Sequence, residues 1–243
     1  MFFLISGEGK TDIGQCDFGQ SRCSGSEFQP GPMGLILDRL LEGMIDYSPL
    51  ETQAMEFVNK HEVVSISRSL PMHVPGKKHD IETGFFFKNA RALARLAEQK
   101  MKAQDGAPVA AVLFRDADGT HSQKHGNFES KWKAMMDGFA AEDFHRGVPM
   151  IPCPKSEAWL LCALRKDRSH DCASLESTLS GNDDAPNPAK TKLAATLAKL
   201  GKTTSDLQAM IMDGALDPGV IDMPSFNRFK ERLEVVVQEM LSA

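Results

Sequence analysis

The sequence contains few cysteines and no long apolar run, and both shortages narrow the classes of protein to which it can belong. Its 243 residues include five cysteines. This odd number, without C-x₂-C spacing, excludes a zinc finger and predicts reduced thiols rather than a disulfide framework. The apolar stretch at residues 1–5 is shorter than a signal peptide or a membrane span. We therefore expect a cytoplasmic protein with no membrane partner.

The chain also lacks an excess of basic residues. Its formal net charge of −5 argues against capture of nucleic acid by a broad positive field. It does not exclude a nucleic-acid substrate, because a bound metal ion can neutralise an acidic site locally. The hydrophobic share of 42% and the charged share of 25% are ordinary for a globular protein, so a core of normal size can form.

Apolar runs and helical periodicities alternate along the first two thirds of the chain. Strands are predicted over residues 2–6, 61–67, 109–114 and 148–151, and helices over 33–45, 81–104, 128–141 and 156–164, with Ser156 as a helix N-cap. A Gly- and Ser-rich segment at 14–31 is predicted to be a long loop. The β-α-β order predicts an α/β fold with a mainly parallel, Rossmann-like sheet flanked by helices.

The last third of the sequence has no predicted strand. Residues 168–189 are rich in Ser, Asn, Asp and Pro, which is typical of a linker or lid. Helices are predicted over 190–200, 204–212 and 225–241. We therefore expect an α/β domain over residues 1–167, and a linker with an α-helical C-terminal part packed on that domain over residues 168–243.

Acidic residues follow three of the four predicted strands. The first strand is followed by Glu8-Gly9-Lys10-Thr11-Asp12, the third by Asp116-Ala117-Asp118-Gly119, and the fourth by Glu157. Because the carboxyl ends of parallel strands share one edge of a sheet, we expect these carboxylates to converge. Close carboxylates repel one another unless a cation lies among them, and Mg²⁺ or Mn²⁺ prefers oxygen ligands. The sequence therefore predicts a divalent-metal site.

Each of these features also has a simpler explanation. Asp-rich turns are common after strands. Lys10-Thr11 is not a phosphate-binding P-loop, because Leu4 stands where that motif requires glycine. Lys10 either neutralises a substrate phosphate as a point charge or is solvated. The same two alternatives, contact with a nucleic-acid backbone or solvation, apply to the basic residues Arg68, Lys77, Lys78 and His121.

The two acidic motifs resemble the two signatures of the Toprim fold, which occurs in topoisomerases, bacterial primases, a ribosomal-RNA maturase and the OLD (overcoming lysogenisation defect) nucleases. Glu8 followed four residues later by Asp12 is closer to the OLD-like nucleases. Three further segments resemble small stand-alone OLD-like proteins: Glu157-Ala158-Trp159-Leu160-Leu161, Pro188-Ala189-Lys190 and Pro224-Ser225-Phe226-Asn227-Arg228-Phe229. The resemblance extends from Phe2 to about Leu233.

The resemblance implies roles for particular residues. The implied ligands of two divalent ions are Glu8, Asp12, Asp116, Asp118 and Glu157, with Ser156 as an auxiliary ligand. Glu8, Asp116 and Asp118 are thereby also implied catalytic residues, and Lys190 is the implied stabiliser of the transition state. Ala189 separates Pro188 from Lys190, which departs from the Pro-Lys motif of the family. The larger OLD nucleases also carry an ATPase domain that this chain lacks, so a separate ATPase partner is compatible with it.

The function implied by the resemblance is that of a Mg²⁺-dependent nuclease, which hydrolyses phosphodiesters by a two-metal mechanism and serves as an effector of anti-phage defence. Topoisomerase chemistry is disfavoured, because its nucleophilic tyrosine could only be Tyr47, which lies in a predicted helix. Two alternatives stay open. One is a partner-gated or non-catalytic subunit of an ATPase complex, and the other is an enzyme of phosphotransfer to a small nucleotide. A homo-oligomer is compatible with each, and the sequence does not distinguish DNA from RNA.

Overall fold

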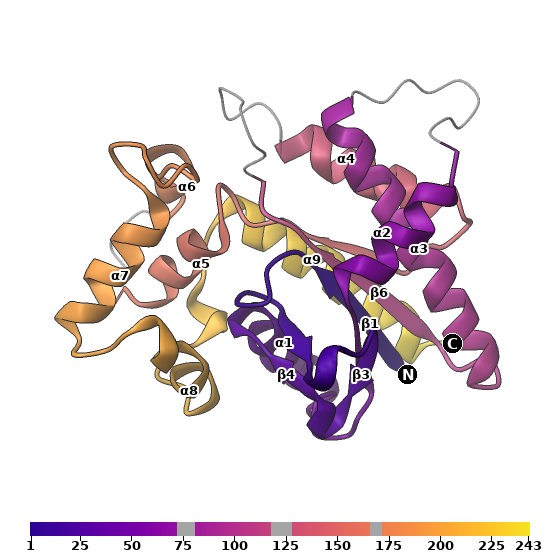
Figure 1. Cartoon of the computed structure of the whole chain (residues 1–243). Helices are drawn as coiled ribbons and strands as arrows, with labels where there is room; N and C mark the ends of the chain where they lie inside the picture. The colour runs from indigo at the N-terminus through magenta and orange to yellow at the C-terminus, as the bar shows by residue number, and fades with distance from the viewer. Residues whose placement is uncertain (72–80, 118–127, 166–171) are drawn as a thin grey trace.

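The computed structural model describes residues 1–71, 81–117, 128–165 and 172–243, and their centre is a five-stranded sheet with strand order β3-β5-β1-β6-β7 (Figure 1). The four parallel strands are β1 (Phe2–Gly7), β5 (Met55–Val58), β6 (Val109–Phe114) and β7 (Gly147–Met150). The edge strand β3 (Arg22–Ser24) runs antiparallel to β5. The prediction of an α/β fold with a mainly parallel sheet is confirmed.

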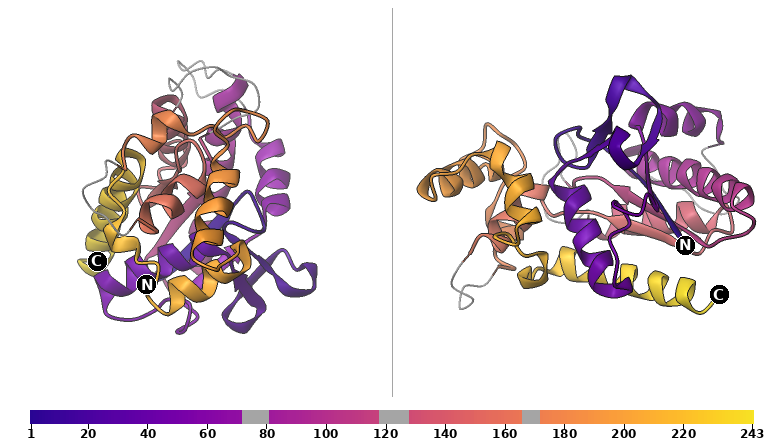
Figure 2. Two further views of the ribbon diagram at one scale, coloured as in Figure 1. Left: turned by 90° about the vertical axis from the view of Figure 1, so that its left-hand side faces the viewer. Right: turned by 90° about the horizontal axis from the view of Figure 1, so that it is seen from below.

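Successive residues of the central strands face opposite layers of helices. In β1, Phe3 and Ile5 join an apolar cluster with α1 (Pro32–Ile45) and α9 (Pro224–Leu241). Leu4 joins a second cluster with α3 (Ile81–Ala103) and α4 (Phe128–Ala140). Figure 2 shows α1 and α9 along one face of the sheet and α3 along the other. Because side chains alternate along a strand, a sheet covered on both faces needs strands that are apolar throughout.

The remaining helices include a group at one side of the sheet. Among the described residues, the remaining α-helices are α2 (Lys60–Ser69), α5 (Ser156–Ala163), α6 (Leu175–Thr178), α7 (Ala189–Lys199) and α8 (Leu207–Met212). Short 3₁₀ helices there include η1 (Asp17–Gly19), η2 (Gly25–Glu27), η4 (Thr204–Asp206) and η5 (Pro218–Val220). Helices α6, α7 and α8 lie together with α5 at the side of the sheet away from both chain termini (Figures 1 and 2). The predicted helical C-terminal part is confirmed.

Helix α9 is anchored to α5 by an aromatic cluster. The buried ring of Trp159 packs edge-on against Phe226, at 5.0 Å between ring centroids, and stacks on Phe229 at 5.7 Å. Its indole N–H donates a hydrogen bond to the Ser225 hydroxyl at 2.9 Å. A buried indole nitrogen needs such an acceptor. The packing of Trp159 in the core thus joins two of the short motifs on which the family resemblance rests.

The prediction of a strand over residues 61–67 is wrong, because this segment belongs to helix α2. The Asn59 side chain caps this helix by accepting a hydrogen bond from the Glu62 N–H at 2.9 Å. Val63 and Ser67, four residues apart, are its buried positions, which is helical rather than strand spacing. The strand beside β1 is instead β5, which ends directly before Asn59.

The segment 14–31 is more ordered than a long loop. It contains the antiparallel pair β2 (Gly14–Cys16) and β4 (Phe28–Pro30) as well as the edge strand β3. A disulfide joins Cys16 to Cys23, and a second joins Cys162 at the end of α5 to Cys172. The expectation of reduced thiols is therefore wrong for these four cysteines. Each of the two disulfides closes a short loop, and the odd total of five cysteines gave no indication of them.

The lengths and compositions of the helices bear on whether one of them could span a membrane. None in the described part of the chain combines the length and the apolar character needed to cross a lipid bilayer.

Candidate functional site

Asp12 is held at the end of a tight turn that follows β1. Its N–H donates to the Gly9 carbonyl at 3.2 Å, and its own carbonyl accepts from the Met33 N–H at 2.9 Å, in the first turn of α1. Gly9 has φ +89°, and a Cβ there would lie 2.3 Å from Asp12 Oδ2. The turn therefore requires glycine at this position, both for its backbone conformation and for its close approach to the carboxylate.

Asp116 is held by an extension of the sheet beyond β6. The Arg115 N–H donates to the Met150 carbonyl at 3.1 Å, and the Ala117 N–H donates to the Pro152 carbonyl at 2.9 Å. The Ala117 carbonyl in turn accepts from the ammonium of Lys131, a buried residue of α4. The backbone on both sides of Asp116 is therefore fixed relative to the segment that leads to α5.

Ser156 joins the two acidic motifs. Its hydroxyl donates to Asp12 Oδ1 at 2.6 Å, and its backbone N–H donates to Asp116 Oδ1 at 3.0 Å. A longer contact, 3.4 Å, reaches Glu157 Oε2. The N-cap of α5 is Lys155 rather than Ser156, so the prediction of a capping role is wrong. The buried Ser156 side chain orients carboxylates instead.

The acid cluster, defined as Asp12, Asp116 and Glu157, is electrostatically frustrated. Burial, and then the charges of Asp12 and Glu157, raise the pKa of the Asp116 carboxyl from 3.8 to about 8, although the hydrogen bond from Ser156 opposes this change. Burial and the charge of Asp12 also raise the pKa of Glu157. These shifts have the physical causes expected when carboxylates are brought together in a poorly hydrated place.

Hard oxygen donors of this kind fit Mg²⁺ or Mn²⁺, and a divalent cation would relieve the repulsion among them. Within the described ranges, no three His, Cys, Asp or Glu side chains are arranged closely enough to hold an ion as they stand. The predicted ligand Asp118 lies outside the described residues, as do Lys77, Lys78 and His121. The structure thus brings together Asp12, Asp116, Ser156 and Glu157 of the predicted metal ligands.

Glu8 does not contact the acid cluster. Its carboxylate is bound by the Lys60 ammonium and, at 2.6 Å, by the Arg115 guanidinium. Burial acts to raise the pKa of Glu8, but the hydrogen bonds and charges of these two cations outweigh it and hold the pKa below its ordinary value. Glu8 continues the side of β1 that carries Leu4, the side covered by α3, which explains its separation from the cluster.

Three other predicted residues are described. Lys10 is exposed in the turn after β1, and Arg68 is exposed in the last turn of α2. Lys190 is exposed in the first turn of α7, and its ammonium makes no hydrogen bond or ion pair with the rest of the described chain. The segment before α7 does reach the start of α5, where Lys155 Nζ lies 3.5 Å from Asp183 Oδ1.

Lys60 and Arg115 are site residues that the sequence analysis missed. Arg115 directly precedes the second acidic motif, so its position was a usable signal. Lys60 follows β5. Because the second strand was predicted at residues 61–67, Lys60 was not expected at the carboxyl edge of the sheet.

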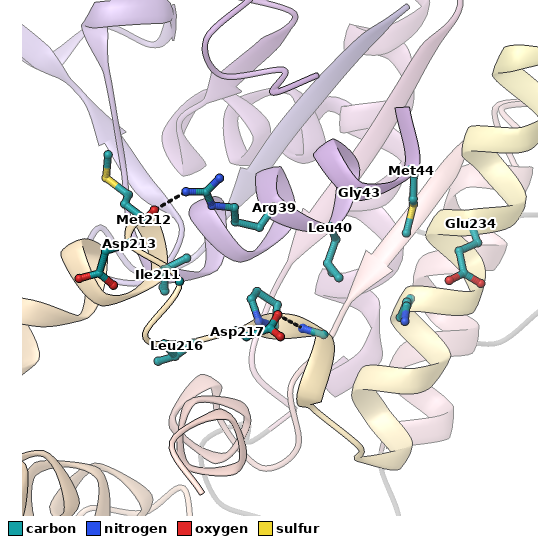
Figure 3. Close-up of a pocket in the computed structure, with 14 residues that line it drawn as sticks. Arg39, Leu40, Gly43, Met44, Ile211, Met212, Asp213, Leu216, Asp217 and Glu234 are labelled. Atoms are coloured by element: carbon teal, nitrogen blue, oxygen red, sulfur yellow. Dashed lines mark hydrogen bonds between the residues drawn. The ribbon is translucent and has the colours of Figure 1, made fainter. Parts of the chain in front are cut away.

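An open depression of about 740 Å³ lies elsewhere, among α1, α8, η5 and α9 (Figure 3). Arg39 and Met44 line it from α1, Asp217 lies just before η5, and Glu234 faces it from α9. None of the predicted site residues lines this depression. Side chains of both charges and apolar side chains are mixed in it, and they indicate no particular class of ligand.

Comparison of the chain with models of protein families, with curated proteins and with solved structures finds no match.

Proposed function

We propose that the chain is a divalent-metal-dependent nuclease that hydrolyses phosphodiesters with Mg²⁺ or Mn²⁺. The observation that carries the proposal is the convergence of Asp12, Asp116 and Glu157, from three distant parts of the sequence, on Ser156 at the carboxyl edge of the sheet. The edge of a parallel sheet is where ligands bind in folds of this class. The raised pKa of Asp116 is the kind of perturbation that marks functional carboxylates.

Each residue has a role in this proposal. Asp12, Asp116 and Glu157 supply oxygen ligands, and Ser156 holds two of these carboxylates in place through its N–H and hydroxyl. When bound, divalent ions supply the Lewis acidity that phosphodiester hydrolysis requires. Lys131, through the Ala117 carbonyl, fixes the backbone beside Asp116, so that the carboxylate does not have to be reoriented when an ion arrives.

The resemblance to Toprim proteins of the OLD-like group extends the proposal in three respects. It implies a second ion, with Glu8 and Asp118 among its ligands, and it implies Lys190 as the residue that offsets charge on the phosphate. It also implies a nucleic-acid substrate, a separate ATPase partner and a role in defence against phage. Lys190 lies in the first turn of α7, the helix that packs against α5, and α5 also carries Ser156 and Glu157.

Cleavage assays test this proposal. The protein is incubated with plasmid DNA, single-stranded DNA and transfer RNA, each with Mg²⁺, with Mn²⁺ or with a chelator. The matched pair of variants is Asp116→Asn and Asp38→Asn. Asp38 is also a buried carboxyl with a pKa raised by burial, and it accepts hydrogen bonds from Ser48 Oγ at 2.8 Å and the Leu50 N–H at 2.9 Å.

We expect cleavage of at least one substrate by the wild type and by Asp38→Asn, and its loss with the chelator or in Asp116→Asn. Metal-dependent cleavage that persists in Asp116→Asn would refute the assignment of the site.

A partner-gated subunit is the second candidate, and one observation favours it. The carboxylate of Glu8 is bound by Lys60 and Arg115, so an implied metal ligand is engaged elsewhere. In a gated protein, binding of a partner would release Glu8. This candidate predicts no cleavage by the chain alone, together with intact binding of Mn²⁺ at the acid cluster.

A further inference from the structure

We propose that Lys60 and Arg115 form a binding site for a phosphate group of the substrate, and that Glu8 occupies this site in the substrate-free protein. The inference deepens the proposed nuclease function and rests on it for the identity of the phosphate as part of a nucleic acid. The contacts that form the anion site do not involve the acid cluster, so binding of an anion there can be measured without catalysis.

Three neighbouring strands build the site. Glu8 follows the central strand β1, Lys60 follows β5 on one side, and Arg115 directly follows β6 on the other. A single carboxylate therefore lies between two cations supplied by the flanking strands. With Glu8 in place, the three side chains still carry one net positive charge, so the site remains attractive to an anion.

Arg115 is held ready to bind a planar pair of oxygen atoms. Its guanidinium lies over the ring of Phe86 at 5.0 Å from the ring centroid, and its backbone is fixed to β7 through the Met150 carbonyl. The side chain is only 20% exposed. Because the Phe86 ring already restricts the Arg115 side chain, little further side-chain entropy is lost when its N–H donors bind a ligand. Such a preoriented guanidinium is suited to recognition of a phosphate.

Lys60 supplies the second cation from the first residue of α2. Its side chain is 46% exposed, so the ammonium can follow a ligand that is larger than a carboxylate. The amino end of α2 adds a partial positive charge in the same place. A guanidinium fork recognises two phosphate oxygens at once, and a compact ammonium beside it adds a second point charge.

Glu8 is an exchangeable occupant. Its side chain is as exposed as that of Lys60, at 46%, and ion pairs in contact with water contribute little net stability. A phosphate that displaces Glu8 would keep both cations paired and would free the Glu8 carboxylate, which the family resemblance implies as a metal ligand. Arg115 directly precedes Asp116 in the chain, so the phosphate site and the acid cluster belong to the same carboxyl edge of the sheet. One exchange would thereby place the substrate and supply a ligand.

Binding measured in the presence of a chelator tests the site. The probe is a fluorescently labelled single-stranded DNA oligonucleotide, followed by anisotropy at low ionic strength, with inorganic pyrophosphate as competitor. The variants are Glu8→Gln, Lys60→Gln and Arg115→Gln. The matched controls are Glu42→Gln and Arg39→Gln, which alter an exposed ion pair on α1, and Lys133→Gln, which alters one on α4.

We expect Glu8→Gln to bind the oligonucleotide more tightly than the wild type, because the cations lose their internal partner. Lys60→Gln and Arg115→Gln should each bind about tenfold more weakly or worse, as expected for loss of a charge-assisted hydrogen bond. Arg115→Lys keeps the positive charge but loses the fork of N–H donors, so its affinity for the oligonucleotide should lie between those of the wild type and Arg115→Gln. The controls should follow the wild type, and pyrophosphate should compete less well against binding by Lys60→Gln and Arg115→Gln.

Unchanged or weaker binding by Glu8→Gln would overturn the proposal, as would wild-type binding by both Lys60→Gln and Arg115→Gln. If Arg115→Gln fails to fold, as judged by circular dichroism, Arg115→Lys and Lys60→Gln decide the matter. The outcomes are separable from those of the cleavage assay. Intact anion binding without any metal-dependent cleavage would refute the nuclease and keep the site, whereas cleavage with unchanged KM in Lys60→Gln and Arg115→Lys would refute the site alone.

Discussion

The hydroxyl of Ser156 donates a hydrogen bond of 2.6 Å to Oδ1 of Asp12, a residue 144 positions earlier in the chain. The same serine uses its backbone N–H to hold Asp116. One buried residue at the start of α5 therefore sets the separation and orientation of two carboxylates that arrive from different strands. Such hydrogen bonds to the ligands of a metal ordinarily have a strong influence on its affinity.

Replacement of Ser156 by alanine removes the bond to Asp12 and keeps the bond to Asp116. We expect the affinity for Mn²⁺ to fall about 10- to 100-fold, as is typical when a hydrogen-bond partner of a metal ligand is lost. The free energy of unfolding should fall by only about 1 kcal/mol. Calorimetric titration and denaturant unfolding measure the two quantities. In Ser67→Ala, which removes another buried hydroxyl, Mn²⁺ affinity should be that of the wild type; an equal loss of affinity there would contradict this account.

The stability of the metal-free protein should fall as the pH rises. The pKa of Asp116 is about 8 in the folded protein against an ordinary value of 3.8, so between these values the folded state binds a proton that the unfolded state has released. The stabilisation from this proton is complete below the lower value and is lost as the pH rises through the higher one. The slope for a single proton is at most about 1.4 kcal/mol per pH unit.

Denaturant unfolding at a series of pH values, in the presence of a chelator, measures this slope. Asp116→Asn should remove the contribution, so that the difference in unfolding free energy between this variant and the wild type changes across the window. Asp213→Asn, which alters an exposed acid at the end of α8, serves as the control. A difference that is constant with pH for Asp116→Asn would show that its carboxyl is not perturbed.

The aromatic cluster between α5 and α9 should carry a large share of the stability of the C-terminal part. Phe229→Ala empties a fully buried position against Trp159, and such a truncation typically costs about 3–5 kcal/mol. Val235→Ala, at a half-exposed position of the same helix, should cost much less. Denaturant unfolding of the two variants compares them. Similar losses for both would mean that α9 is not anchored as described.

Reduction should destabilise the protein. The bridges Cys16–Cys23 and Cys162–Cys172 close loops with sequence separations of 7 and 10, and the chain-entropy estimate for loops of this size is about 2–3 kcal/mol each. Thiol titration of the unfolded, unreduced protein should detect Cys153 alone, and Cys162→Ser should add one thiol. Five reactive thiols without reductant would contradict the disulfides.

Most of the fold follows from apolar patterning, and the errors have identifiable causes. The strand at residues 109–114 and the helix of α9 were predictable because one is continuously apolar and the other has a clear helical period. Residues 61–67 were predicted as a strand because their β-branched residues favour strands locally. They form a helix because Asn59 caps its start and because Val63 and Ser67 are buried on one side of it. The short strand β5 has four residues, too few to show a period.

The candidate site was only partly predictable for a different reason. That Asp12, Asp116 and Glu157 would share an edge follows from the parallel order of the strands. Which of the edge residues pair with one another depends on the side of the sheet to which each side chain points, and this is fixed by the register of β1 and β6. Glu8 therefore meets Lys60 and Arg115 instead of the acid cluster, and Ser156 bonds to Asp12 rather than capping its own helix.

The central claim is that Asp116 and its neighbours bind a divalent cation, and Mn²⁺ binding followed by electron paramagnetic resonance tests it most directly. The wild type is compared with Asp116→Asn and with Asp38→Asn. Asp38 is a buried acid of α1 whose carboxylate accepts hydrogen bonds from Ser48 and Leu50 in the turn after that helix. We predict saturable binding that Mg²⁺ competes away, retained in Asp38→Asn and lost in Asp116→Asn. Equal binding by wild type and Asp116→Asn, or no binding by the wild type, would contradict the account.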